Sequence, residues 1–142
     1  MKKKNCICEF SSQRSMALLT NFRRAIANQS RISAQKAFKE AVESPVPRFW
    51  VSEARATRVI TALINGIDLT EGMHSEKRKM YLDIYAGVIE EKKNNPQKPI
   101  GDIVFDIVNS PAPRSYMKWQ TAGKIIRASR KNASLNSTKS LK

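Results

Sequence analysis

The sequence is poor in the residues from which most enzyme and metal sites are built. Its 142 residues include one histidine, two cysteines and five glycines, too few for a histidine-based metal or catalytic site or for a disulfide-rich scaffold. It contains neither the glycine-rich motifs of phosphate-binding loops nor the Gly-x-Ser-x-Gly motif of hydrolases. No apolar run approaches the roughly 18 residues that a membrane-spanning helix needs. We therefore expect a protein that is not an enzyme, has no cofactor or metal and does not bind a membrane.

Acidic residues are also scarce. Twelve Asp and Glu stand against 26 Lys and Arg, which gives a formal net charge of +14. Solubility alone needs only about 2–8 units of net charge in a small domain. A surface this basic attracts polyanions through counterion release, and nucleic acid is the commonest such partner. The excess is uneven: +6 in residues 1–33, +2 in 34–64, zero in 65–99 and +6 in 100–142.

The chain contains an internal repeat at an offset of 66 residues. The segment ESPVPRFW at 43–50 recurs as NSPAPRSY at 109–116. The match extends upstream through an acid-x-Val pattern, and downstream through the pattern Ala-x-basic-aliphatic-Ile-x-Ala. We interpret residues 33–64 and 99–130 as two copies of one helix–extended loop–helix unit.

Hydrophobic periodicity predicts a mainly helical fold with about six helices. Two helices, 13–28 and 75–93, lie outside the repeat. The first copy supplies a helix capped by Ser33 and a second one over 53–65, and the second copy supplies 100–108 and a helix from 119 or 121 to 130. The prolines of each Ser-Pro-x-Pro motif end the preceding helix, because proline has no amide donor and disfavours helix in the residue before it. The extended pieces 49–51 and 115–117 could pair as a short two-stranded ribbon.

Composition divides the chain into three parts. We expect a basic flexible arm over 1–12, a single helical domain over 13–131 and a disordered basic tail over 132–142. The tail is rich in Ser, Asn and Lys and has no acid, so it buries too little apolar area to offset its ordering entropy.

The N-terminal arm carries three lysines but no uninterrupted apolar stretch after them, so we expect no secretion signal and a cytoplasmic protein. Cys6 and Cys8 are then reduced thiols. A Cys-x-Cys pair could begin a zinc site, but zinc requires four ligands and His74 is the only other obvious one.

The repeated motif presents an arginine and an aromatic residue after a stiff Pro-x-Pro segment. Arg48 precedes Trp50 by two residues, and Arg114 precedes Tyr116 by two. A planar guanidinium can bind a phosphate in bidentate fashion or read a guanine edge. The alternative is structural. The arginines would then brace the loops by bonding carbonyl groups, and the aromatic residues would be anchors in the core. For the aromatic residues we prefer this structural interpretation.

The second helix of each copy carries a row of basic side chains spaced for one helix face. The row consists of Arg55 and Arg58 in the first copy and of Lys124, Arg127, Arg130 and Lys131 in the second. This resembles a helix-turn-helix in outline, although the connection between the two helices is about nine residues instead of the usual three or four. A merely solvated face is the alternative interpretation of such a row.

Together these features favour a small nucleic-acid-binding protein that serves as a regulator or accessory factor, with DNA preferred over RNA as the partner. The alternative is a protein-interaction adaptor or assembly component that docks a partner through its Ser-Pro-x-Pro-Arg-x-aromatic loops. The two hypotheses differ in their dependence on salt. Electrostatic binding to a nucleic acid weakens steeply as salt rises, whereas an apolar complex barely responds.

Overall fold

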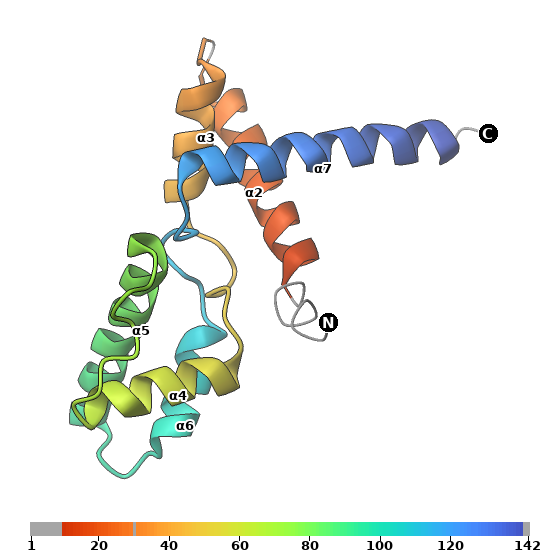
Figure 1. The fold of residues 1–142 in the computed structure, drawn as a ribbon. Helices are drawn as coiled ribbons and strands as arrows, with labels where there is room; N and C mark the ends of the chain where they lie inside the picture. Colours follow the sequence, from red (N-terminus) through yellow and green to blue (C-terminus); the bar gives the residue numbers. More distant parts are fainter. Residues whose placement is uncertain (1–9, 30, 141–142) are drawn as a thin grey trace. The chain divides into compact units, whose positions relative to one another are not determined.

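The computed structural model describes residues 10–29 and 31–140, with side chains up to Lys131. The described residues form six helices and no strand, which confirms the predicted mainly helical fold (Figure 1). The helices are α2 (Ser11–Ala27), α3 (Ala34–Glu43), α4 (Glu53–Ile64), α5 (Ser75–Asn94), α6 (Ile100–Val108) and α7 (Trp119–Ser140).

Local signals in the sequence explain where several helices begin and end. The Ser33 hydroxyl accepts a hydrogen bond from the Lys36 amide at the start of α3, and the Ser52 hydroxyl accepts one from the Arg55 amide at the start of α4. Each bond satisfies one of the amide groups that a helix N-terminus leaves without an intrahelical partner. After α4, Gly66 adopts a φ of 85°, which glycine reaches without steric cost.

The predicted ribbon of 49–51 with 115–117 is not confirmed, and the described residues hold instead one isolated antiparallel bridge between Val46 and Ala112. The Val46 amide donates to the Ala112 carbonyl at 3.0 Å, and the Ala112 amide donates back to the Val46 carbonyl at 2.9 Å. Prolines stand on both sides of each of these two residues. In the described residues the ladder does not extend beyond this pair.

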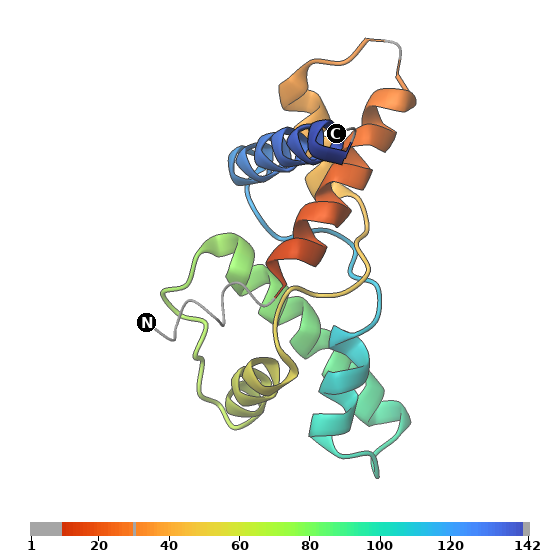
Figure 2. The ribbon, with the colours of Figure 1, turned by 90° about the vertical axis from the view of Figure 1, so that its right-hand side faces the viewer.

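The chain divides into two compact units. Unit 1 consists of Met1–Ser44 and Met117–Lys142 and contains α2, α3 and α7; unit 2 consists of Pro45–Tyr116 and contains α4, α5 and α6. Within unit 1, α7 packs against both α2 and α3 (Figures 1 and 2). Within unit 2, α6 packs against both α4 and α5.

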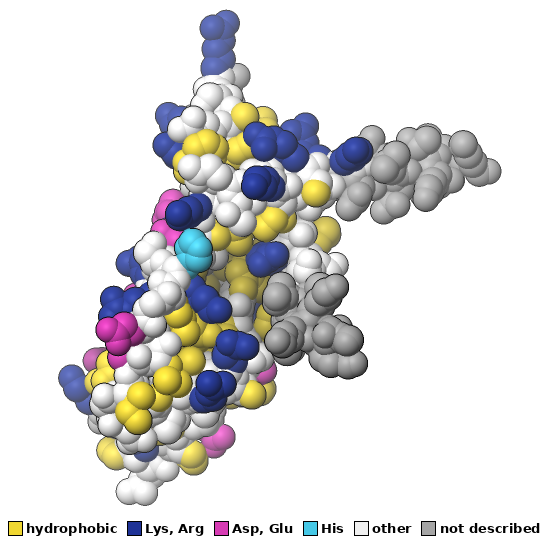
Figure 3. Space-filling model, in the orientation of Figure 1, with side chains coloured by type: hydrophobic (Ala, Val, Ile, Leu, Met, Phe, Trp, Pro, Cys, Tyr) yellow, Lys and Arg dark blue, Asp and Glu magenta, His cyan; other side chains and the backbone are white. Residues whose placement is uncertain are grey.

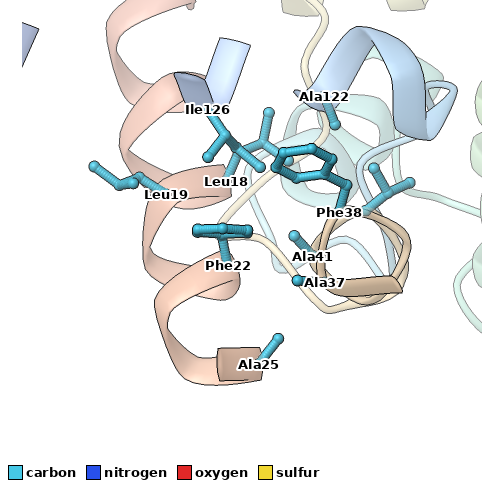
Figure 4. Packing of buried hydrophobic residues seen from close by; sticks show 10 residues of the cluster. Leu18, Leu19, Phe22, Ala25, Ala37, Phe38, Ala41, Ala122 and Ile126 are labelled. Atoms are coloured by element: carbon cyan, nitrogen blue, oxygen red, sulfur yellow. The ribbon is translucent and has the colours of Figure 1, made fainter. Parts of the chain in front are cut away.

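The core of unit 1 joins residues from all three of its helices (Figure 4). Leu18 and Phe22 come from α2, Phe38 from α3 and Ile126 from α7, and all four side chains are buried. The rings of Phe22 and Phe38 stack with their centroids 5.2 Å apart. Gly123 of α7 lies against the Phe38 ring, where any added methyl group would come within 2.9 Å of a ring carbon.

The core of unit 2 joins residues from all three of its helices. The large apolar side chains that are fully buried are Tyr81, Ile84 and Val88 of α5, Ile60 of α4, and Ile103, Val104 and Val108 of α6. At the end of the unit Tyr116 is also buried: its ring stacks on Phe49 and its hydroxyl donates a 2.6 Å hydrogen bond to Asp83. These contacts hold Tyr116 at a φ of 54°, which residues other than glycine rarely adopt.

The sequence predicts a flexible arm and a disordered tail at the two ends of the chain. The sequence pattern ends the last helix at Arg130, whereas α7 continues to Ser140. A disordered tail over 132–142 stays a prediction. Most of the predicted N-terminal arm, with Cys6 and Cys8, lies outside the described residues.

Candidate nucleic-acid interface

The net charge of the chain belongs almost entirely to unit 1. The sequence segments of unit 1 contain sixteen basic and three acidic residues, a net charge of +13, while unit 2 contains ten basic and nine acidic residues, a net charge of +1. The fold produces this separation because it brings the basic N-terminal and C-terminal segments into one unit. Figure 3 shows Lys and Arg side chains over both units, whereas Asp and Glu lie mostly over the part that holds α4, α5 and α6.

Helix α7 has one face in the core of unit 1 and another that is basic. Ala122 and Ile126 are fully buried, whereas Lys124, Arg127 and Lys131 are exposed. The exposed residues follow one another at spacings of three and four, which places them on one side of a helix. A polyanion that lies along α7 would meet all three charges.

Cations of unit 1 lie over aromatic rings of the same unit. The Arg127 guanidinium is 4.9 Å from the centroid of the Phe38 ring, and that of Arg130 is 5.4 Å from the centroid of Phe22. A cation–π contact holds a guanidinium against a ring without neutralising its positive charge. Within the described part of the chain neither arginine has a carboxylate partner.

Helices α2 and α3 add further exposed cations to unit 1. They are Arg23 and Arg24 of α2 and Lys36 and Lys39 of α3. Lys39 lies over the ring of Trp119, the first residue of α7, with its Nζ 5.7 Å from the ring centroid. The described acids of unit 1 are Glu40 and Glu43, and Glu40 already accepts a 2.7 Å hydrogen bond from Gln29. Little negative charge therefore opposes a polyanion at these helices.

Arg48 of the first repeated motif lies in unit 2 and bonds to the loop around it. Its Nε donates to the Phe49 carbonyl at 2.9 Å and its Nη2 to the Val51 carbonyl at 2.7 Å. Its Nη1 donates to Oδ1 of Asn109 at 3.0 Å, so the arginine links the two proline-containing segments. The Asn109 amide in turn donates to Glu53 and lowers the pKa of that carboxyl below its ordinary value. These bonds correspond to the bracing alternative for Arg48.

The second motif arginine, Arg114, also has partners inside unit 2. Its Nη1 donates to Oε1 of Glu76 at 2.6 Å, and its guanidinium lies 5.2 Å from the centroid of the Tyr116 ring. Only 14% of its side chain is exposed. Arg114 therefore ties the loop that follows α6 to the start of α5.

The remaining predicted site residues of unit 2 are Arg55 and Arg58, both exposed on α4. Burial raises the pKa of Tyr81, and the positive charges of the two arginines oppose that rise, since both lie near its hydroxyl. They stand in a unit whose charges nearly balance.

The structure thus distributes the eight predicted site residues over both units: Arg48, Arg55, Arg58 and Arg114 lie in unit 2, and Lys124, Arg127, Arg130 and Lys131 lie on α7 in unit 1. The sequence interpretation did not include the exposed cations of α2 and α3. A tally of charge along the chain could not find them, because their proximity to α7 depends on which helices pack together.

Neither a metal site nor a membrane-spanning helix is found in the described part of the chain. Its residues include no group of three or more His, Cys, Asp or Glu side chains that could hold a metal ion. None of its helices is long and apolar enough to cross a membrane. Comparison with known proteins finds no matching family model, no matching curated protein and no matching solved structure.

Proposed function

We propose that this protein is a non-catalytic nucleic-acid-binding factor and that unit 1 is its binding unit. The observation that carries the proposal is the concentration of a net charge of +13 in unit 1, against +1 in unit 2. Counterion release from the phosphate backbone favours association with such a unit whatever the base sequence. A role as a regulator or accessory factor of DNA fits a small protein of this kind.

The exposed side of α7 is the proposed contact surface. Gln120, Lys124, Arg127 and Lys131 follow one another at helical spacing and are all exposed. They extend over about 16 Å of helix, at roughly 1.5 Å per residue. An α-helix fits the major groove of B-DNA, whereas the major groove of A-form RNA is too narrow for side chains to read. This favours duplex DNA as the partner.

Arg48 and Arg114 act, in this proposal, as braces of the proline-containing loops and not as contacts to the ligand. Their hydrogen bonds to Val51 and Glu76 occupy the groups that a phosphate would need. The adaptor alternative needs the aromatic residues of the two motifs at the surface, but Tyr116 is buried and Trp50 is only partly exposed. For this reason we prefer nucleic-acid binding.

The experiment is a salt titration of affinity for a fluorescent DNA duplex, measured by polarisation. The test variant combines Lys124→Gln, Arg127→Gln and Lys131→Gln. If all three side chains contact phosphates, the slope of log affinity against log salt falls by about three units, one for each lost contact.

The matched control removes three exposed cations from unit 2, with Lys77→Gln, Lys79→Gln and Lys93→Gln. Both triple variants lower the net charge by the same amount, so a general charge effect changes them equally. The proposal requires a clearly smaller slope for the α7 variant than for the control. Equal slopes, or an intact protein whose affinity does not respond to salt, would refute it.

We further propose that the repeated motif reflects an internal duplication. Both helices of the first copy have counterparts in the second copy at the 66-residue offset. Helix α3 begins at Ala34 and α6 at Ile100, and α4 begins at Glu53 and α7 at Trp119. The bridged residues Val46 and Ala112 are themselves equivalent at this offset. A duplicated segment that pairs with its own copy accounts for both observations.

A further inference from the structure

The 66-residue offset extends beyond the sequence motif to the first helix of each half, α2 and α5. Helix α2 shifted by 66 residues covers 77–93, which lies within α5 (Ser75–Asn94). Burial follows the same offset, since Leu18 and its counterpart Ile84 are both fully buried, and Phe22 and Val88 are both buried. The sequences at these positions differ, which explains why the sequence match did not extend to α2 and α5.

The first two helices of each half pack against one another, α2 with α3 and α5 with α6, but the third helix does not join them. The third helix of the first half, α4, packs against α5 and α6 of the second half. The third helix of the second half, α7, packs against α2 and α3 of the first half. We infer that residues 11–64 and 77–130 are two copies of one three-helix unit that have exchanged their third helices, so that each copy is the partner that completes the other.

Equivalent residues of the two exchanged helices occupy equivalent places. Ala56 of α4 and Ala122 of α7 are both fully buried, and so are Ile60 and Ile126. Each helix therefore offers the same small-plus-branched apolar face to the pair of helices that receives it. The bridge between Val46 and Ala112 adds a contact in which a residue meets its own counterpart, as in an isologous interface between two identical partners.

The exchange determines which half of the chain supplies each exposed cation of unit 1. What this means for binding rests on the proposed function. Arg24 and Lys39 come from the first half of the chain, while Lys124 and Arg127 come from the second. The proposed interface is therefore composite, and neither half carries it alone. Separation of the halves removes binding even when every charged residue is retained.

The exchange is tested by double-mutant cycles in the full chain, with stability followed by urea denaturation. Leu18 and Ile126 belong to one core cluster, whereas without exchange Leu18 would share a core with Ile60. Substitutions of residues that are in contact are non-additive, and those of distant residues add. The inference predicts that Leu18→Ala is non-additive with Ile126→Ala and additive with Ile60→Ala. The reverse pattern, or equal coupling to both, overturns it.

A second measurement remains valid if the alanine variants fold poorly. A protease site inserted between Glu71 and Gly72, both exposed in the loop that joins the halves, allows the folded protein to be cut there. After the cut, helix exchange predicts that the circular dichroism spectrum persists and that the two fragments co-elute until urea is added. Fragments that separate while staying folded overturn the exchange. Neither experiment uses nucleic acid, so failure of the proposed function and failure of the exchange are distinguishable.

Discussion

The substitution Gly123→Ala probes the contact between α7 and α3 directly. The new methyl carbon would lie 2.9 Å and 3.0 Å from two carbons of the Phe38 ring. That ring cannot move away freely, since Phe38 is 3% exposed, stacks on Phe22 and lies under Arg127. Overpacking of this kind costs about 1–3 kcal/mol.

The same substitution also has a favourable component. Alanine stabilises a helix interior by about 0.5–1 kcal/mol relative to glycine, mainly because glycine loses more backbone entropy on folding. The net expectation for Gly123→Ala is therefore a loss of up to about 2 kcal/mol in the free energy of unfolding.

Gly101→Ala is the matched control, because a methyl group at Gly101 of α6 meets nothing within 4 Å. It should stabilise the protein by up to about 1 kcal/mol. Urea denaturation of the two variants, with unchanged m values, measures the difference. If Gly123→Ala stabilises the protein as much as Gly101→Ala does, α7 does not pack on α3 in the way described.

Other predictions concern the brace, acid stability and the tail. Arg48→Ala leaves two loop carbonyls without their donor and should lower stability by about 1–3 kcal/mol for each carbonyl that stays buried, with an unchanged salt slope for DNA binding. Hydrogen bonds from the Thr70 hydroxyl and amide lower the pKa of Asp68. The stability that its ionised form provides is therefore present above its unfolded-state pKa and is lost as pH falls through its folded-state pKa. In urea titrations at several pH values, the difference in stability between the wild type and Asp68→Asn should be largest near neutral pH and should disappear in acid. Deletion of 132–142 should leave the melting temperature unchanged in calorimetry and weaken DNA binding, whereas a lowered melting temperature would contradict the predicted disorder.

The positions of the helices could be predicted because their determinants are local. Apolar spacing identified the cores of all six helices, and the capping serines Ser33 and Ser52 fixed two of the starts within a residue. The prolines that flank Val46 and Ala112 were visible in the sequence as well. The pairing of 49–51 with 115–117 was not predicted correctly, since the one bridge among the described residues joins Val46 and Ala112.

The partners of the helices could not be predicted in the same way. Periodicity shows that Ile60 and Ile126 face inward, but it does not show against which helices they pack. In the fold each faces helices from the opposite half of the chain. The candidate site depends on this choice, because only the packing of α7 against α2 and α3 brings both basic ends into one unit.

The roles of the arginines depended on tertiary partners too. Arg48 and Arg114 occupy identical positions in the repeat, yet one bonds to carbonyl groups and Asn109 while the other pairs with Glu76. Neither Asn109 nor Glu76 is adjacent to its arginine in the sequence. Residue type and spacing therefore singled out both arginines of the loops. They did not decide whether each arginine braces its loop or contacts a ligand.

The central claim is that unit 1, through α7, is the part of the protein that contacts nucleic acid. The most direct measurement is an NMR titration of isotopically labelled protein with a short DNA duplex at low salt. The account predicts that amide shifts concentrate in unit 1, at α7 around Lys124 and Arg127 and at the neighbouring cations of α2 and α3. Shifts that concentrate at Arg55 and Arg58 of unit 2, or a spectrum that the duplex leaves unchanged, would contradict it.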